Sequence, residues 1–193
     1  MSNWLAFYHR HPGPLLVLAT AGIFGVMYLA AAGNGWGTYR RLSQAMLAGR
    51  LDIDARQLDA WHLRDLAVYQ GRWYYPMGVL PAIVLLPGVA AVGLDFPQGA
   101  LVLALALAIG YFTYRLARRL GHGERDALWV VVALMLGSPL AYLVLRATVF
   151  DTYLTHLLTL ACLLAALAEY LGRRRWWGLG ALVGLSTMAR PLT

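Results

Sequence analysis

Side chains suited to proton transfer and phosphate binding stand at two places in this sequence. Within residues 51–75, four aspartates lie among three arginines: Asp52, Asp54, Asp59 and Asp65 among Arg56, Arg64 and Arg72. Further along, Arg146 and Asp151 lie in the stretch LRATVFDTYLTH, between two apolar runs. An aspartate can accept a proton as a general base, and the fork of an arginine matches the oxygens of a phosphate.

Each of these residues also has a structural interpretation. Arg146 and Asp151 can pair with each other at the edge of a membrane, and Asp65 can be an ordinary loop acid. Arg190 can extend from an apolar helix towards the membrane surface. We expect no metal and no cofactor, because the five histidines show no ligand spacing such as HExxH.

The composition predicts an all-α, polytopic membrane protein. Hydrophobic residues make up 60% of the 193 residues and charged residues only 13%, against roughly 25% in soluble domains. Several charge-free runs reach the roughly 17–25 residues that a membrane-spanning helix needs. The expected spans are residues 14–33, 99–116, 127–145, 152–171 and 177–189. The net charge of +7 comes from arginines at the ends of these runs. Membrane lipids are therefore expected as partners, and nucleic acid is not.

Residues 34–75 form the one long polar stretch, and we expect residues 34–97 to be a loop outside the membrane. In GTYRRLSQAMLAGR, Tyr39, Leu42, Ala45 and Met46 fall on one helical face, with Arg40 and Ser43 pointing away. Gly49 can end this helix. The pattern predicts a short amphipathic helix at the membrane surface.

The stretch of residues 76–97 permits two topologies. It is apolar enough to span, but Pro81 and Pro87 interrupt it, and proline inside a helix removes a hydrogen bond. A broken helix at the interface gives five spans, whereas a spanning helix gives six. The distribution of arginines favours six spans with the long loop in the cytoplasm.

The order of segments resembles the N-terminal half of GT-C membrane glycosyltransferases, the bacterial relatives of protein O-mannosyltransferases and of lipid A aminoarabinose transferases. The likeness runs from about Pro14 to Pro191. The segments that carry it, after the first apolar run and the charged loop, are GRWYYPMGVLPAIVLLPGVAAVGL, RLARRLG, LMLGSPLAYLVLRATVFDTYLTHLLTLACLLAAL, RRRWW and GLGALVGLSTMARP.

This resemblance implies transfer of a sugar from a polyprenyl-phosphate donor to an acceptor on the outer face of the bacterial inner membrane. It also favours five spans, because the stretch after the surface loop often lies at the interface in that family. Asp151 matches the family's acidic residue before a span, and Arg190-Pro191 its basic site. The implied catalytic residues are Asp65 and Asp151, with Asp52 and Asp54 as rivals of Asp65, and the implied ligands of the lipid phosphate are Arg146, Arg190, Arg64 and Arg72.

Two departures from the family keep other functions open. Many members carry an acidic pair directly after the first span, where this chain has Asn34 and Gly35. Members also continue for several more spans, so we expect the chain to be the N-terminal part of an enzyme or to need a partner subunit. The alternatives are a non-enzymatic transporter-like or scaffolding membrane protein, and an inactive subunit that binds lipid phosphate.

Overall fold

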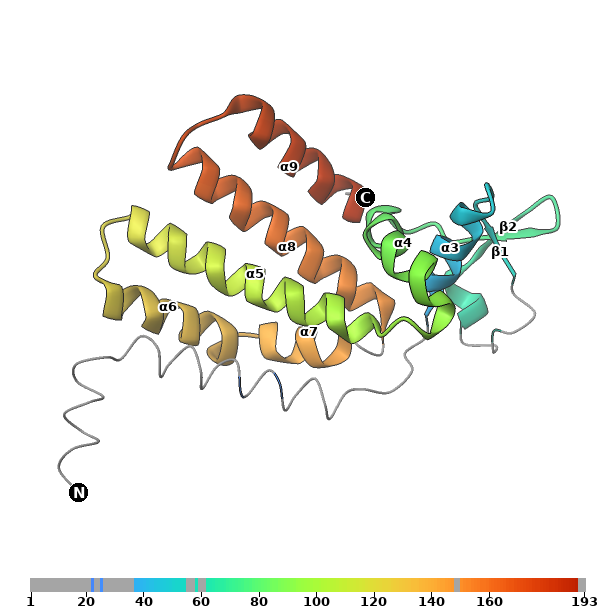
Figure 1. The fold of residues 1–193 in the computed structure, drawn as a ribbon, viewed down its shortest axis with the longest axis horizontal. Coiled ribbons are helices and arrows are strands. Elements are labelled where there is room, and N and C mark those ends of the chain that lie inside the picture. Colours follow the sequence, from blue (N-terminus) through green and yellow to red (C-terminus); the bar gives the residue numbers. More distant parts are fainter. Residues whose placement is uncertain are drawn as a thin grey trace, which may run out of the picture.

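The computed structural model describes residues 37–54, 58, 62–147 and 150–190, together with Gly22 and Gly25. The described part is mostly helical. The expected first span, residues 14–33, lies outside the described residues apart from those two glycines. Figure 1 shows helices α9, α8, α5 and α6 side by side, with α3, α4 and a small sheet gathered at one end.

Helices α5 (Gln98–Arg119) and α8 (Asp151–Tyr170) are the two long helices of the bundle, with 22 and 20 residues. At 1.5 Å per residue, α5 is about 33 Å long, enough for a hydrocarbon core of roughly 30 Å. Within the described residues, these two are the helices long and apolar enough to cross a membrane individually. They match the expected spans at 99–116 and 152–171.

The expected span at residues 127–145 is two helices rather than one. Helix α6 (Glu124–Gly137) and helix α7 (Leu140–Ala147) meet at a bend of 59°. The bend follows from Pro139, because Ser138 before it is extended (ψ 171°) and proline has no N–H to continue the helix. Together the two helices are long and apolar enough for a membrane span with a bend in it or for a re-entrant loop, so the predicted span at residues 127–145 stays a prediction.

Helix α9 (Trp176–Ala189) occupies the last expected span, at residues 177–189, and packs along α8. It has 14 residues, about 21 Å of helix, which is short of the roughly 17–25 residues of a usual span.

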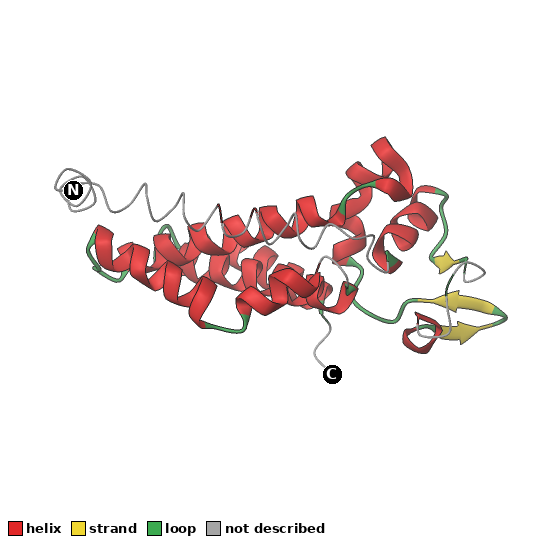
Figure 2. Ribbon diagram, turned by 90° about the horizontal axis from the view of Figure 1, so that it is seen from below, coloured by secondary structure: helices red, strands yellow, loops and turns green. Residues whose placement is uncertain are grey.

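The polar loop contains a small sheet that the sequence analysis did not predict. Helix α3 (Thr38–Leu47) is followed by β1 (Asp52–Ile53), the 3₁₀ helix η2 (His62–Asp65), β2 (Ala67–Tyr69) and β3 (Arg72–Tyr74). The strands are antiparallel in the order β1-β3-β2, and Figure 2 shows them at one end of the molecule. The turn of the hairpin places Gln70 and Gly71 at positive φ.

Helix α4 (Leu80–Val92) is continuous, so the prediction of a broken helix was wrong. Pro81 sits in the first turn, where the missing N–H costs no internal hydrogen bond, and Pro87 lies on an exposed side of the helix. The helix has 13 residues, about 20 Å, and a 3₁₀ turn, η3 (Gly93–Asp95), follows it. This length suits a helix at the interface better than a sixth span.

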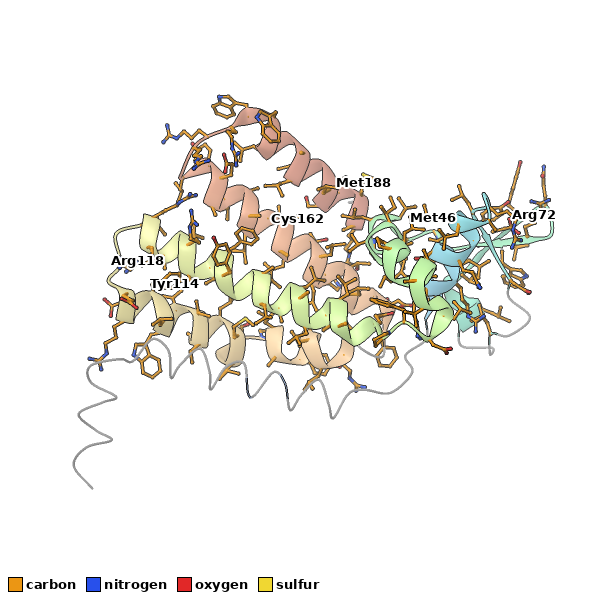
Figure 3. All side chains as sticks on the ribbon, viewed as in Figure 1. Met46, Arg72, Tyr114, Arg118, Cys162 and Met188 are labelled. Atoms are coloured by element: carbon orange, nitrogen blue, oxygen red, sulfur yellow. The ribbon has the colours of Figure 1, made fainter. Side chains whose placement is uncertain are left out.

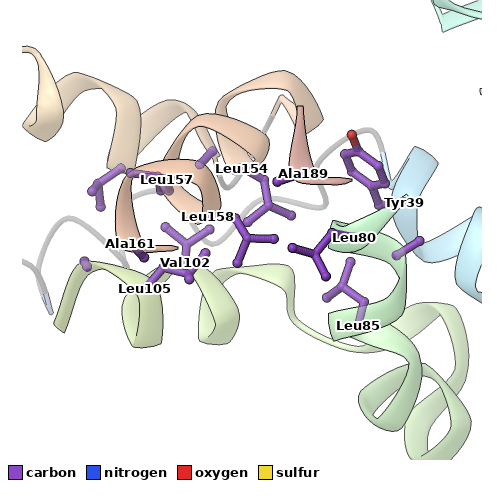
Figure 4. Packing of buried hydrophobic residues seen from close by; sticks show 14 of the residues in the cluster. Tyr39, Leu80, Leu85, Val102, Leu105, Leu154, Leu157, Leu158, Ala161 and Ala189 are labelled. Atoms are coloured by element: carbon purple, nitrogen blue, oxygen red, sulfur yellow. The ribbon is translucent and has the colours of Figure 1, made fainter. Parts of the chain in front are cut away.

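The core joins the loop to the long helices. Figure 4 shows Leu80 and Leu85 of α4 beside Val102 of α5 and Leu154 of α8. Helix α3 buries Tyr39, Leu42 and Ala45, as predicted, and ends before Gly49, whose φ of 70° suits glycine. The same helix also buries Arg40 and Ser43, which were expected to face away. The Oγ atom of Ser43 lies 2.7 Å from the carbonyl oxygen of Ala82, which ties α3 to α4.

Candidate functional site

Asp151 lies where the loop meets the bundle. Its side chain is only 2% exposed, and its Oδ2 accepts a hydrogen bond of 2.7 Å from the backbone N–H of Thr38. Thr38 begins α3 and Asp151 begins α8, so the carboxylate faces the positive ends of two helix dipoles. The side chain of Gln98, at the start of α5, is buried nearby and donates to the carbonyl oxygen of Ala147 at 2.9 Å.

Tyr75 is a buried tyrosine whose pKa is shifted by the charges of two of the predicted carboxylates. Burial raises the pKa of the Tyr75 hydroxyl above its ordinary value, and the charges of Asp151 and Asp65 raise it further. The ring of Tyr39 meets the ring of Tyr75 edge to face, with centroids 4.9 Å apart. Burial also raises the pKa of Tyr39. The two predicted carboxylates therefore act on one buried tyrosine, although Asp65 itself is exposed.

Several buried polar atoms around Asp151 have no hydrogen bond of normal geometry within the described residues. They are Oη of Tyr39, Oε1 of Gln98 and Oδ1 of Asp151. Leaving a buried polar atom unpaired costs about 1–3 kcal/mol, so most such atoms in proteins bind water or a ligand. We call the residues Thr38, Tyr39, Arg40, Tyr75, Gln98 and Asp151 the junction cluster. It can take up a further polar group.

Arg40 supplies the positive charge of the junction cluster. Its Nη1 donates to the carbonyl oxygens of Leu94 (2.7 Å) and Phe96 (3.2 Å), which hold the link between α4 and α5 against α3. Burial lowers the pKa of the guanidinium, and the negative charge of Asp151 opposes that shift. The charge of Arg40 therefore acts on Asp151, whereas Arg146, which the structural interpretation of the sequence paired with Asp151, contacts Tyr142 and Phe150 instead.

Arg146 lies at the end of α7, among aromatic side chains. Its guanidinium carbon is 5.5 Å from the centre of the Tyr142 ring and 5.4 Å from that of Phe150. The ring of Tyr153 lies beside both of these rings. Its centroid is 5.8 Å from that of Tyr142 and 6.0 Å from that of Phe150. Arg146 is exposed, so its charged group is open to an anion at the end of the bundle.

Arg190 completes this row from the end of α9. Its Nη1 lies 2.7 Å from Nδ1 of His156, whose ring stands 6.4 Å from that of Tyr153. We call Arg146, Tyr142, Phe150, Tyr153, His156 and Arg190 the aromatic row. The two arginines predicted from the bundle thus stand at its two ends.

The predicted residues of the loop separate into two groups. The charge of Asp65 acts on Tyr75 and raises its pKa, whereas Asp52 is engaged by Arg50 at 3.3 Å and by Arg72 at 3.7 Å. Asp54 and Asp65 are both exposed. Figure 3 places Arg72 at the tip of the sheet, away from the bundle. Arg64 belongs to η2, and its side chain lies outside the described part of the chain.

Sequence reasoning missed part of the junction cluster and of the aromatic row. Tyr75 was interpreted as an interfacial anchor, Arg40 as a solvent-facing residue and His156 as a packing residue. One signal was available, since Arg40 and Ser43 are three positions apart and adjoin the apolar face of their helix. No local signal distinguishes Gln98, because its role depends on where α7 ends.

No protein-family model matches the chain, and neither a curated protein nor a solved structure matches it. The case for a function therefore depends on the residues and their geometry.

Proposed function

We propose that this chain is the N-terminal part of a GT-C-type membrane glycosyltransferase. It would take a sugar from a polyprenyl-phosphate carrier and transfer it to a hydroxyl acceptor on the outer face of the bacterial inner membrane. The observation that carries the proposal is the buried carboxylate of Asp151, which binds the N–H of Thr38 at 2.7 Å where the loop meets the bundle. Arg146 and Arg190 stand at the same end of the bundle, on the aromatic row.

The chemistry follows from these positions. Asp65, the exposed carboxylate, removes the proton of the acceptor hydroxyl, whose oxygen attacks the anomeric carbon of the sugar. The bond between that carbon and the phosphate oxygen breaks, and the lipid phosphate leaves with the electron pair. The guanidinium groups of Arg146 and Arg190 stabilise the negative charge on the leaving phosphate. Of the two loop arginines, Arg64 is proposed to contact the donor, whereas Arg72 is paired with Asp52 at the tip of the sheet.

Asp151 has a different task in this proposal. Its Oδ2 is occupied by the N–H of Thr38, and its burial keeps it from bulk solvent. We assign it as a positioning residue that fixes α3, and with it Tyr39 and Tyr75, against the start of α8.

The test is sugar transfer in membranes from cells that express the full chain. The probes are mannosyl and aminoarabinosyl polyprenyl phosphates carrying a radiolabelled sugar. We expect Asp65→Asn to lower the transfer rate by about 100-fold or more, as loss of a general base does. Asp151→Asn should also lower the rate, and Asp126→Asn, an exposed carboxylate in the first turn of α6, is the matched control. Transfer by Asp65→Asn at the wild-type rate would contradict the proposal.

A non-enzymatic membrane subunit is the second candidate, and one observation favours it. A buried carboxylate bound to a helix N-terminus, as Asp151 is, needs no catalytic role to be explained. This candidate predicts no transfer by the wild-type chain with either probe, while the chain still inserts into the membrane.

A further inference from the structure

Arginines gather at the end of the bundle opposite the junction cluster. This end, which we call the turn end, consists of the turn between α5 and α6 and the turn between α8 and α9. Figure 3 labels Arg118 there, far from Arg72 at the sheet. The arginines are Arg115, Arg118, Arg119, Arg125, Arg173, Arg174 and Arg175, and they outnumber the carboxylates Glu124, Asp126 and Glu169.

The two turns form one continuous surface. A Cβ atom added at Gly172, in the turn after α8, would overlap the guanidinium group of Arg119 from the end of α5. The side chain of Arg119 therefore lies directly on the neighbouring turn. Among the described residues, Glu169 forms a close ion pair with Arg175, whose Nε lies 2.8 Å from Oε1 of Glu169, and this hydrogen bond raises the pKa of Arg175.

Aromatic rings are interleaved with these arginines. The guanidinium carbons of Arg115, Arg174 and Arg175 lie 5.7, 5.6 and 5.4 Å from the ring centres of Tyr111, Tyr170 and Trp177. Trp176 and Trp177 are 72% and 74% exposed. Exposed tryptophan beside arginine suits the headgroup region of a bilayer, where the ring meets acyl chains and the cation meets phosphate.

We infer that the turn end binds the headgroups of anionic phospholipids. Arginine forks donate paired hydrogen bonds to phosphodiester oxygens, and the excess of positive charge selects headgroups with a net negative charge over zwitterionic ones. This inference requires that the chain sits in a membrane, but it does not depend on sugar transfer.

Lipid selectivity of the purified full chain tests the inference. The probes are phosphatidylglycerol and phosphatidylcholine, added to the protein in neutral detergent, with retained lipids counted by native mass spectrometry. We expect tighter binding of phosphatidylglycerol, and a loss of about tenfold in its affinity for Arg125→Gln/Arg174→Gln. Both arginines are exposed, so the variant should keep the wild-type unfolding temperature.

The matched control is Arg41→Gln/Arg50→Gln, which removes the same charge from α3 and the residues after it, at the opposite end. It should keep the wild-type selectivity. Equal affinity of the wild-type chain for the two lipids would overturn the inference, as would an equal loss in the control. If the turn end instead binds an acidic protein, we expect the wild-type chain to bind the two lipids with equal affinity. Loss of sugar transfer by Asp65→Asn does not bear on either result, because Asp65 lies at the other end.

Discussion

The carboxylate of Asp151 lies beside the N-termini of two helices, α3 and α8. It is the first residue of α8, and it binds the first N–H of α3 at 2.7 Å. Gly37, at the N-cap position of α3, offers no side chain to do this. A charged acceptor at such a position contributes both a hydrogen bond and a favourable interaction with the helix dipole.

Removing this acceptor should destabilise the protein measurably. We expect Asp151→Ala to lower the free energy of unfolding by about 2 kcal/mol, because the N–H of Thr38 is left buried and unpaired. Asp151→Asn keeps a side-chain oxygen and should lose less. Thermal unfolding of the purified variants in detergent measures the difference, with Asp126→Ala as the exposed control. Equal losses for the alanine and asparagine variants would show that Thr38 does not depend on this oxygen.

At the residue scale, the sequence predicted where a residue lies along a helix better than which residues it contacts. Asp151 does begin a helix, and Arg190 does lie at the end of the next one. The partner of Asp151 is 113 residues away in the chain, so no pattern within one segment could reveal it. Arg146, five residues from Asp151, was the obvious candidate and instead stacks on Tyr142 and Phe150.

At the scale of elements, the end of α9 is pressed against the segment that leaves the sheet. Gly78 lies in this segment, just before α4 begins. A Cβ atom there would overlap the carbonyl oxygens of Met188 and Ala189, which belong to the last turn of α9. Neither group is the end of a flexible side chain, so the backbone would have to move.

Gly78→Ala should therefore separate α9 from the loop. We expect a loss of about 1–3 kcal/mol in the free energy of unfolding, the usual effect of overfilling a packed site. Gly180→Ala is the control, because nothing lies within 4 Å of a Cβ at that position in α9. Alanine is the better helix former, so this control should be neutral or slightly stabilising. Thermal unfolding of both variants gives the comparison, and a stable Gly78→Ala would contradict the close contact.

Elements were predictable where long apolar patterns determine them. Helices α5 and α8 follow from their charge-free runs, and the end of α3 follows from Gly49. Proline did not predict helix breaks reliably. The chain bends at Pro139, whereas α4 is continuous although it contains Pro81 and Pro87. The strands of the loop have two or three residues each, too few for an alternating pattern to stand out.

At the scale of the molecule, the two ends of the bundle differ in charge and in shape. One end carries the junction cluster and the sheet, and the other carries the arginines of the turn end. If α5 and α8 cross a membrane, these ends face opposite sides of it. The proposed glycosyltransferase needs the junction cluster outside, whereas the six-span alternative places the long loop in the cytoplasm.

Cysteine labelling of intact cells decides between the two orientations. In a Cys162→Ser background, we expect Val68→Cys in β2 to react with an impermeant thiol reagent and His122→Cys, after α5, to react only after lysis. Both positions are exposed in the structure, so the membrane alone should set the difference. The reverse pattern would place the loop in the cytoplasm and exclude a donor site on the outer face.

The hydrogen bond between Thr38 and Asp151 also sets the order in which the chain assembles. A ribosome makes the loop early, yet the residue that anchors α3 emerges only after another 113 residues have been added. Until then α3 has neither its N-terminal acceptor nor the core residues of α8, such as Leu154, to pack against. Ribosomes add roughly 5–20 residues per second, so these 113 residues take about 6–23 seconds to make. During that time α3 lacks its N-terminal acceptor, and the junction cluster cannot form before Asp151 is made.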